Sequence, residues 1–212
     1  MSDRNSPDLA AAYSLVTPED NRRLYRNWAT TYDEEFAIRS GYRSAELIAQ
    51  AFLDAGGKGP VLDAGCGTGL VANHLSTGMI VDGVDISPEM MEQARTKGRY
   101  RHLIEADLTN RLPFPNAAYA GLTSSGTFTH GHVGPDVLEE LMRVLQPGAV
   151  CAIGGNTTFF READFKKVFD NLVAKKVIST PTIREERIYD SGATPPDGHE
   201  NDTCFVIVFN RH

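Results

Sequence analysis

A glycine-rich turn is the feature of the sequence best suited to binding chemistry. It lies in residues 61–70, VLDAGCGTGL, where an apolar run typical of a buried strand leads into three glycines and then a helical pattern. Glycines in such a turn allow backbone N–H groups to approach a ligand at the carboxyl end of a parallel strand. The same turn also serves as a plain strand-to-helix connection, so the glycines alone do not decide between the two roles.

The spacing of the glycines favours some ligands over others. Dinucleotide-binding turns have G-x-G-x-x-G, whereas Gly65, Gly67 and Gly69 give G-x-G-x-G and Leu70 takes the place of the final glycine. A phosphate-binding P-loop is excluded because no Lys-Ser or Lys-Thr pair follows. The spacing therefore favours a nucleoside-like cofactor and disfavours a nicotinamide-dependent oxidoreductase.

Two acidic residues end the next two apolar runs. Asp85 could accept both hydroxyl protons of an adenosine ribose. Asp107 could accept from the exocyclic amine of adenine, with Ile86 and Leu108 against the two faces of the ring. Each carboxylate alone is more often a helix cap or a solvated strand end. Together with the glycine turn, the two carboxylates indicate a site for an adenosyl group.

The elements that must position these residues alternate along the chain. Short apolar runs, separated by helical patterns, lie at 61–65, 79–85, 102–106, 118–125 and 149–155. This alternation predicts parallel strands joined by right-handed crossovers, with helices on both faces of the sheet. Two β-like runs with no helix between them, at 182–191 and 202–211, predict an antiparallel hairpin. The predicted fold class is α/β, a doubly wound sheet of about seven strands.

Helix signals flank these runs. Ser87 followed by Pro88 predicts a helix start. Pro135 opens a second predicted helix, which Pro147-Gly148 ends, and a third is expected around 163–174. The sheet is therefore expected to have a helix after most of its strands.

Composition and charge restrict the class of protein. The chain has 212 residues, of which 41% are hydrophobic and 23% charged, as expected for one globular domain. A net charge of -7 opposes binding to nucleic acid. No run approaches the roughly 20 apolar residues of a membrane span, and the N-terminus lacks a signal-peptide pattern, so we expect a cytoplasmic protein. The cysteines, Cys66, Cys151 and Cys204, form no CxxC pair, and we predict reduced thiols and no metal site.

Four segments resemble the motifs of the class I S-adenosylmethionine-dependent methyltransferases: VLDAGCGTG, GVDIS, EADL and LMRVLQPGAV. The resemblance extends over roughly residues 20–211 and implies a Rossmann-like sheet in the order 3-2-1-4-5-7-6 with the last strand antiparallel. It also implies S-adenosylmethionine as the cofactor. The family often has an aspartate at the start of its fourth strand, where residues 116–119 of this chain read NAAY.

The resemblance assigns cofactor contacts residue by residue. Asp85 would bind the ribose, and Asp107 with Leu108 the adenine, as the residues themselves indicate. Ser124 is expected at the cofactor as well. The methionine part would contact the turn, at Asp63, Gly65, Cys66 and Gly67.

An aromatic stripe lies near the N-terminus, with Tyr25, Trp28, Tyr32 and Phe36 on one side of a predicted helix. Such stripes are usually core. The segment is similar to the N-terminal lid helix of small-molecule methyltransferases and, more weakly, of the Williams-Beuren-region methyltransferase-like group. That similarity implies that Tyr25 and Trp28 reach the cofactor and that Tyr32 and Phe36 face the acceptor. We expect residues 1–18 to be weakly ordered and 19–212 to form one domain with a helical lid at 19–55.

The segment after the fourth predicted strand, SSGTFTHGH at 124–132, lies where family members place acceptor-handling residues. Phe128 and His130 are therefore candidates for the acceptor site, and His130 is the candidate base because imidazole titrates near neutral pH. Alternatively, His130 or His132 only caps the helix that Pro135 opens. The opposite wall would come from residues after the fifth strand, Asn156, Phe159 and Phe160, which could equally serve for capping and packing.

Methyl transfer is an in-line displacement that depends mainly on positioning, and it needs a base only when the nucleophile starts protonated. The chain has no added recognition domain and no basic stripe, so a small-molecule acceptor methylated on O, N or S is expected. A protein that binds the cofactor without transfer activity and acts as a regulator or partner remains the alternative, because a fold does not guarantee chemistry. The acceptor and the oligomeric state are left open by the sequence.

Overall fold

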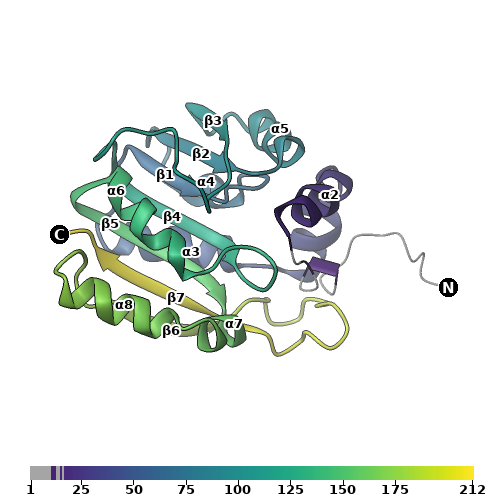
Figure 1. Cartoon of the computed structure of the whole chain (residues 1–212). Helices are drawn as coiled ribbons and strands as arrows, with labels where there is room; N and C mark the ends of the chain where they lie inside the picture. The colour runs from purple at the N-terminus through teal and green to yellow at the C-terminus, as the bar shows by residue number, and fades with distance from the viewer. Residues whose placement is uncertain (1–10, 13–14, 16) are drawn as a thin grey trace.

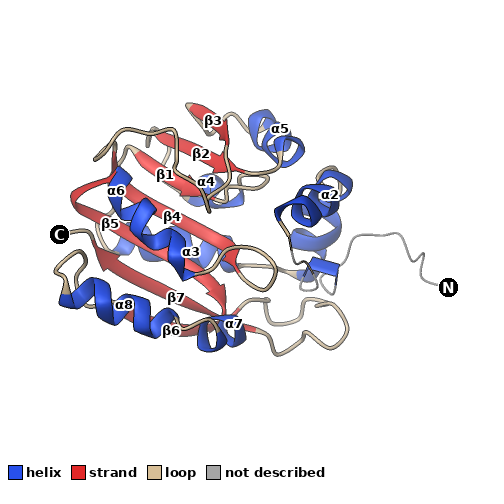
Figure 2. Ribbon diagram, in the orientation of Figure 1, coloured by secondary structure: helices blue, strands red, loops and turns tan. Residues whose placement is uncertain are grey.

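A computed structural model describes residues 11–12, 15 and 17–212 of the chain. A seven-stranded sheet forms the central layer, in the order β3-β2-β1-β4-β5-β7-β6 (Figures 1 and 2). All neighbouring strands are parallel except β7, which runs antiparallel to both β5 and β6. This arrangement confirms the predicted strand order and the C-terminal hairpin. Most of residues 1–18, which we expected to be weakly ordered, lie outside the described residues.

The strands are β1 Val61–Ala64, β2 Val81–Asp85, β3 His102–Glu105, β4 Tyr119–Phe128, β5 Leu145–Asn156, β6 Thr182–Arg187 and β7 Thr203–Asn210. The helices are α2 Pro18–Trp28, α3 Ser44–Asp54, α4 Leu70–His74, α5 Pro88–Thr96, α6 Leu138–Val144, α7 Thr157–Glu162 and α8 Phe165–Ala174. A π-helical segment, η1, spans Tyr32–Ile38, and a short 3₁₀ turn, η2, spans Pro135–Val137. None of the helices in the described part of the chain is long and apolar enough to cross a membrane.

The core has a layer on each face of the sheet. Helices α6 and α8 pack on one face and helices α3 and α4 on the other (Figure 1). Strand β1 is buried at every position, as expected for a central parallel strand covered on both faces. Strand β1 therefore ends inside the molecule, directly at the glycine turn.

Several predicted boundaries differ from the structure. The helix expected at 163–174 is α8, which begins at Phe165 after Asp164, a residue in a left-handed backbone conformation with φ 54°. A separate helix, α7, precedes it and was not predicted. Strand β4 continues to Phe128, beyond its predicted end at residue 125. The Pro147-Gly148 pair lies within β5. The predicted start of α5 is confirmed, because the Ser87 side chain accepts a hydrogen bond from the Met90 N–H.

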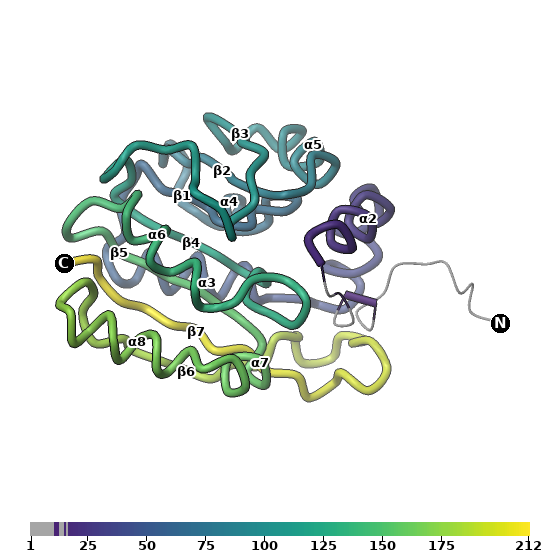
Figure 3. The backbone as a smooth tube through the Cα atoms, viewed as in Figure 1, coloured from purple at the N-terminus to yellow at the C-terminus, as the bar shows by residue number. Residues whose placement is uncertain are grey.

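The aromatic stripe near the N-terminus does not lie on a single helix. Helix α2 ends at Trp28, and η1 begins at Tyr32 after a turn closed by a hydrogen bond from Thr31 N to Trp28 O. Thr30 and Thr31 are weak helix formers, which favours a break at this point. In Figure 3, α2 lies at the edge of the molecule beside α5. The two segments therefore lie against the end of the sheet at which β1 and β2 lead into their turns.

Candidate cofactor and acceptor site

The three glycines of the turn all have left-handed backbone conformations, with φ of 68° at Gly65, 51° at Gly67 and 85° at Gly69. Their surroundings differ. A Cβ on Gly65 would lie 2.0 Å from Thr127 Oγ1, whereas a Cβ on Gly67 would meet nothing closer than 3.9 Å. Gly65 is therefore required by packing against β4, and Gly67 leaves open space for a ligand.

Three backbone N–H groups at the start of the turn are bonded within the protein, whereas the sequence suggested that they would approach a ligand. Gly65 N and Cys66 N both donate to Val84 O, and Gly67 N donates to Asp85 Oδ2. These hydrogen bonds connect the turn to β2, so the three N–H groups are already paired within the protein. The glycines contribute space rather than hydrogen bonds to the site.

Asp85 ends β2 and is held firmly. Its carboxylate accepts from Gly67 N and from Ser87 N, each at 2.8 Å. Burial raises the pKa of Asp85, and the two backbone N–H groups oppose that rise. Each carboxylate oxygen can accept a further hydrogen bond, so the side chain is fixed in place and still able to bind hydroxyl groups.

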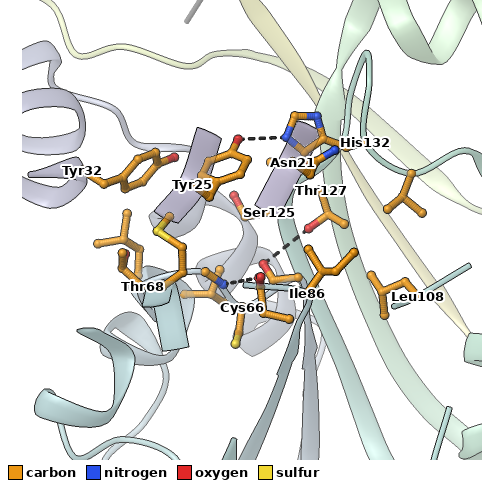
Figure 4. Close-up of a pocket in the computed structure, with 18 of the residues that line it drawn as sticks. Asn21, Tyr25, Tyr32, Cys66, Thr68, Ile86, Leu108, Ser125, Thr127 and His132 are labelled. Carbon is orange, nitrogen blue, oxygen red and sulfur yellow. Dashed lines mark hydrogen bonds between the residues drawn. The ribbon is translucent and has the colours of Figure 1, made fainter. Parts of the chain in front are cut away.

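A pocket of about 980 Å³, its open mouth included, lies over this turn (Figure 4). It brings together most of the residues predicted for the cofactor: Tyr25, Gly65, Cys66, Gly67, Asp85, Ile86, Asp107 and Leu108. Asp107 is oriented through its Oδ1, which accepts from Thr109 N at 2.8 Å and from Thr109 Oγ1 at 2.7 Å. Residues missed by the sequence analysis also line the pocket, among them Asn21, Tyr42, Ser125, Thr127 and His132.

Asp63 and Ser124 lie beneath the turn and do not line this pocket. Asp63 accepts from Tyr100 Oη at 2.7 Å and from Thr123 Oγ1 at 2.9 Å. Ser124 donates to Ala64 O at 2.7 Å. Both side chains therefore support the end of β1 from below, whereas the sequence analysis expected them at the cofactor.

The buried Asp63 carboxyl makes a testable contribution to stability. Burial raises its pKa from 3.8 to about 6. A group whose pKa is raised by folding stabilises the protein fully below its unfolded pKa, and that contribution is lost as pH rises through the folded pKa. We expect the free energy of unfolding to fall by about 2 kcal/mol between pH 4 and 7 relative to Asp63→Asn, because one pKa unit corresponds to about 1.4 kcal/mol and part of the effect is already lost at pH 4. Urea unfolding across this range tests it, and parallel pH curves would contradict it.

A second pocket, of about 590 Å³ with its mouth included, adjoins the first. The two share Tyr25, Tyr32, Tyr42, Gly126 and His132. Trp28 lines only the second pocket, although the sequence analysis expected it at the cofactor. Phe36 and Asn156 also line it, and Asn156 additionally caps α7 by accepting from Phe159 N at 3.1 Å.

Four predicted acceptor residues, Phe128, His130, Phe159 and Phe160, lie outside both pockets. Phe128 is completely buried and packs edge-on against Phe160 and Phe165. Phe159 packs against His130 and Phe165. These aromatic residues belong to the packing between β4 and the α7–α8 pair.

The two histidines after β4 have different positions. His130 lines neither pocket, and its Nε2 is 3.0 Å from Glu162 Oε2. His132 lines both pockets. Neither caps η2, whose N-cap is Gly134 without a side-chain hydrogen bond. The backbone of Gly131, with φ 73°, turns the chain so that the second histidine, not the candidate chosen from the sequence, faces the site.

His132 has a defined tautomer. Its Nδ1 is 2.8 Å from the His130 carbonyl oxygen, and its Nε2 is 2.9 Å from Tyr25 Oη (Figure 4). A carbonyl oxygen only accepts, so Nδ1 carries the hydrogen and Nε2 accepts from the Tyr25 hydroxyl. Burial lowers the pKa of His132. The imidazole is therefore neutral at pH 7 with its lone pair at Nε2.

Polar contacts hold the N-terminal segments over the turn. Asp33 accepts from Thr68 Oγ1 and forms an ion pair with Lys97, whose Nζ also donates to Thr68 O at 2.6 Å. Asn21 Nδ2 donates to Gly131 O at 2.6 Å and so ties α2 to the His132 loop. Groups of three or more His, Cys, Asp or Glu side chains arranged to hold a metal do not occur among the residues that the structure describes.

Comparisons with known proteins agree with this geometry. Residues 62–153 match a family described as a methyltransferase domain. The chain is 31% identical over 149 residues to human methyltransferase-like protein 27, covering 68% of this chain and 61% of that protein. It is 32% identical over 157 residues to a demethylmenaquinone methyltransferase of Symbiobacterium thermophilum, covering 66% of this chain and 62% of that protein. The chain thus matches about three fifths of the length of these two relatives.

Solved structures show the same fold. A methyltransferase from Thermotoga maritima is 19% identical, with a TM-score of 0.60 over 89% of this chain and 98% of that one. The [4+2]-cyclase SpnF is 14% identical, with a TM-score of 0.63 over 93% of this chain and 97% of that one. Through its methyltransferase domain and its sheet order, the chain belongs to the class I S-adenosylmethionine-dependent methyltransferase family.

Proposed function

We propose that the protein transfers a methyl group from S-adenosylmethionine to a small-molecule acceptor. The observation that carries this proposal is the pair of adjoining pockets. The first contains the glycine turn and the carboxylates Asp85 and Asp107, and the second is walled by aromatic side chains. Relatives named as demethylmenaquinone and malonyl-[acyl-carrier protein] methyltransferases support a small acceptor group.

The residues of the first pocket suit S-adenosylmethionine, the methyl donor of the family. Asp85, fixed by two backbone N–H groups, would accept from the ribose hydroxyls. Asp107 would accept from the adenine amine, with Ile86 and Leu108 against the ring. The space beside Gly67 would admit the methionine part. When bound, this cofactor supplies an electrophilic methyl group on a sulfonium.

The protein's own part in the transfer is to position the reactants and exclude water. Tyr25, Tyr32 and His132 line both pockets and thus the boundary that a methyl group would cross. The contacts from Asp33 to Thr68 and from Asn21 to Gly131 hold α2 and η1 over that boundary. We propose that α2, η1 and α3 form the lid expected at residues 19–55.

Calorimetric titration tests the proposal. S-adenosylmethionine and S-adenosylhomocysteine should bind with dissociation constants on the order of micromolar, and NAD should not bind. Screening a metabolite library for release of S-adenosylhomocysteine then separates an enzyme from a cofactor-binding regulator. Binding of NAD in place of both sulfur compounds would contradict the proposal, and tight binding with no release for any acceptor would favour the regulator.

Loosening the lid should weaken cofactor binding. Asp33→Ala removes both the Thr68 hydrogen bond and the Lys97 ion pair. We expect the dissociation constant of S-adenosylhomocysteine to rise about tenfold, which corresponds to about 1.4 kcal/mol. Calorimetry measures the change. Glu35 is an exposed acidic residue on the same segment, so Glu35→Ala is the matched control and should leave the affinity unchanged. Equal affinities of the two variants would show that these contacts do not hold the lid.

A further inference from the structure

We infer that the second pocket binds an uncharged aromatic molecule with a hydroxyl group, and that Tyr25 and His132 remove the proton of that hydroxyl as the methyl group is transferred. This inference rests on the proposed function and names the acceptor class of the same site. It is carried by the side chains that wall the pocket and by the hydrogen-bond chain at its boundary with the first pocket.

The walls of the second pocket are aromatic and uncharged. Of the residues that the structure describes, the His132 imidazole lines it, as do six Tyr, Trp or Phe side chains: Tyr25, Trp28, Tyr32, Phe36, Tyr42 and Tyr189. Among the described residues, no Asp, Glu, Lys or Arg side chain is part of this lining. An unpaired ammonium or carboxylate would lose its hydration here without gaining an ionic partner. A planar apolar ring would instead stack on the walls.

One buried polar group in this pocket lacks a partner. The Thr129 hydroxyl lines the pocket, is buried within a residue only 7% exposed, and has no hydrogen-bond partner in the described part of the chain. A buried hydroxyl without a partner is costly. A polar substituent on the bound ring would satisfy it, so the ligand is expected to be apolar over most of its surface with polar groups at few positions.

The hydrogen-bond chain at the boundary selects a hydroxyl acceptor. Tyr25 Oη donates to His132 Nε2, and His132 Nδ1 is held by the His130 carbonyl. Because Tyr25 and His132 line both pockets, an acceptor hydroxyl at the boundary between them would lie beside this hydrogen-bond chain. In the proposed step, that hydroxyl donates to Tyr25 Oη. The phenol then relays the proton to Nε2.

The atoms and charges balance in this step. The acceptor O–H bond breaks, its proton passes to Tyr25 Oη, and the Tyr25 proton passes to His132 Nε2. The acceptor oxygen forms a bond to the methyl carbon, and the carbon–sulfur bond breaks with its electron pair going to sulfur. A positive sulfonium and a neutral imidazole become a neutral thioether and a positive imidazolium.

The surroundings of His132 keep its imidazole neutral at pH 7, so that Nε2 can accept a proton. Its neighbours in the two pockets include titratable groups from several elements, namely Tyr25, Tyr32, Tyr42, Cys66, Asp85, Asp107, Tyr189 and Cys204. Burial raises the pKa of Tyr42 to about 12 and that of Cys204 to about 11, so these groups stay uncharged. Burial of the imidazole itself lowers its pKa. We therefore expect turnover to fall with acid only below pH about 6.5.

Three probes of matched size test the acceptor class: 4-propylphenol, 4-propylbenzylamine, which is cationic at pH 7, and 4-propylbenzoate. Each is titrated into the protein saturated with S-adenosylhomocysteine. The phenol should bind at least about tenfold more tightly than either charged probe. It should also change the fluorescence of Trp28, the only tryptophan of the chain and part of the second pocket. With S-adenosylmethionine, the phenol should yield its methyl ether.

Two variants test the proton path. His132→Gln and Tyr25→Phe should each lower turnover of the phenol by about 10²-fold or more, while S-adenosylhomocysteine still binds. The acid limb of the pH profile should disappear in His132→Gln, a result that a purely structural role would not produce. His102→Gln, at an exposed position on β3, is the matched control and should retain full turnover.

Failure of this inference can be told apart from failure of the proposed function. If the unaltered protein does not bind S-adenosylhomocysteine, the proposed function fails. If it does bind, then preference for the amine or the benzoate, absence of phenol binding, or full turnover in either variant overturns the inference alone. A loss found in His130→Gln instead of His132→Gln would overturn it as well.

Discussion

Asp85→Ala is expected to weaken the binding of S-adenosylhomocysteine by about 10- to 150-fold. Hydrogen bonds to a charged group contribute about 1.5 to 3 kcal/mol, which corresponds to that range. The carboxylate also holds Gly67 N and Ser87 N, so the variant loosens the turn in addition to losing the ribose bonds. Calorimetric titration of the purified protein measures the effect.

Two further variants make the Asp85 result specific. Asp85→Asn keeps an acceptor oxygen but removes the charge, so its affinity should lie between those of the unaltered protein and Asp85→Ala. Asp197→Ala, at an exposed position, should leave the affinity unchanged. If Asp85→Ala bound the ligand as tightly as the unaltered protein, the assignment of the first pocket to an adenosyl group would fall.

Gly65→Ala should be the most destabilising substitution in the turn. The new Cβ would lie 2.0 Å from Thr127 Oγ1 and 2.8 Å from Thr127 Cγ2, and the residue would remain at φ 68°. Overpacking costs about 1–3 kcal/mol and a left-handed backbone about 1–2 kcal/mol, so we expect a loss of about 2–5 kcal/mol. Urea unfolding measures this loss.

Gly67→Ala is the matched comparison because its Cβ meets no atom closer than 3.9 Å. We expect it to cost only the backbone strain of about 1–2 kcal/mol, yet to weaken cofactor binding by occupying the space beside Asp85. The two variants thus separate the packing role of one glycine from the binding role of the other. Equal losses of stability in both would contradict this division.

The sequence, with its family resemblance, was sufficient for the order of the strands and for most of the proposed cofactor pocket. Alternating apolar runs and helical patterns define parallel strands, and right-handed crossovers bring the ends of β1 and β2 to one edge of the sheet. Asp85 ends β2, and Gly67 and Leu108 lie in the turns just after β1 and β3, so all three come to the same edge of the sheet. The position of a residue at the end of a strand can be predicted from the order of strands and helices along the chain.

Other features required the packed structure. The sequence could not show that the Asp63 side chain turns away from the first pocket and accepts hydrogen bonds from Tyr100 and Thr123. These partners are distant in the chain, and a shift of one residue along a strand moves a side chain to the opposite face of the sheet. Nor could it show that Trp28 belongs to the second pocket only, since the break between α2 and η1 sets the direction of the aromatic rings.

The choice between His130 and His132 shows the same limit most clearly. The two residues are of the same type and lie in the same loop, so pattern and composition cannot distinguish them. The left-handed turn at Gly131 and the bond from Asn21 to its carbonyl decide which imidazole faces Tyr25. Sequence alone predicted the alternating strands and helices from local periodicity, and its resemblance to the methyltransferase family supplied the strand order and most of the residues of the proposed adenosyl site. Only the tertiary structure showed that Tyr25 and His132 meet where the two pockets join. Their contact links segments about a hundred residues apart in the chain, which no local pattern reveals.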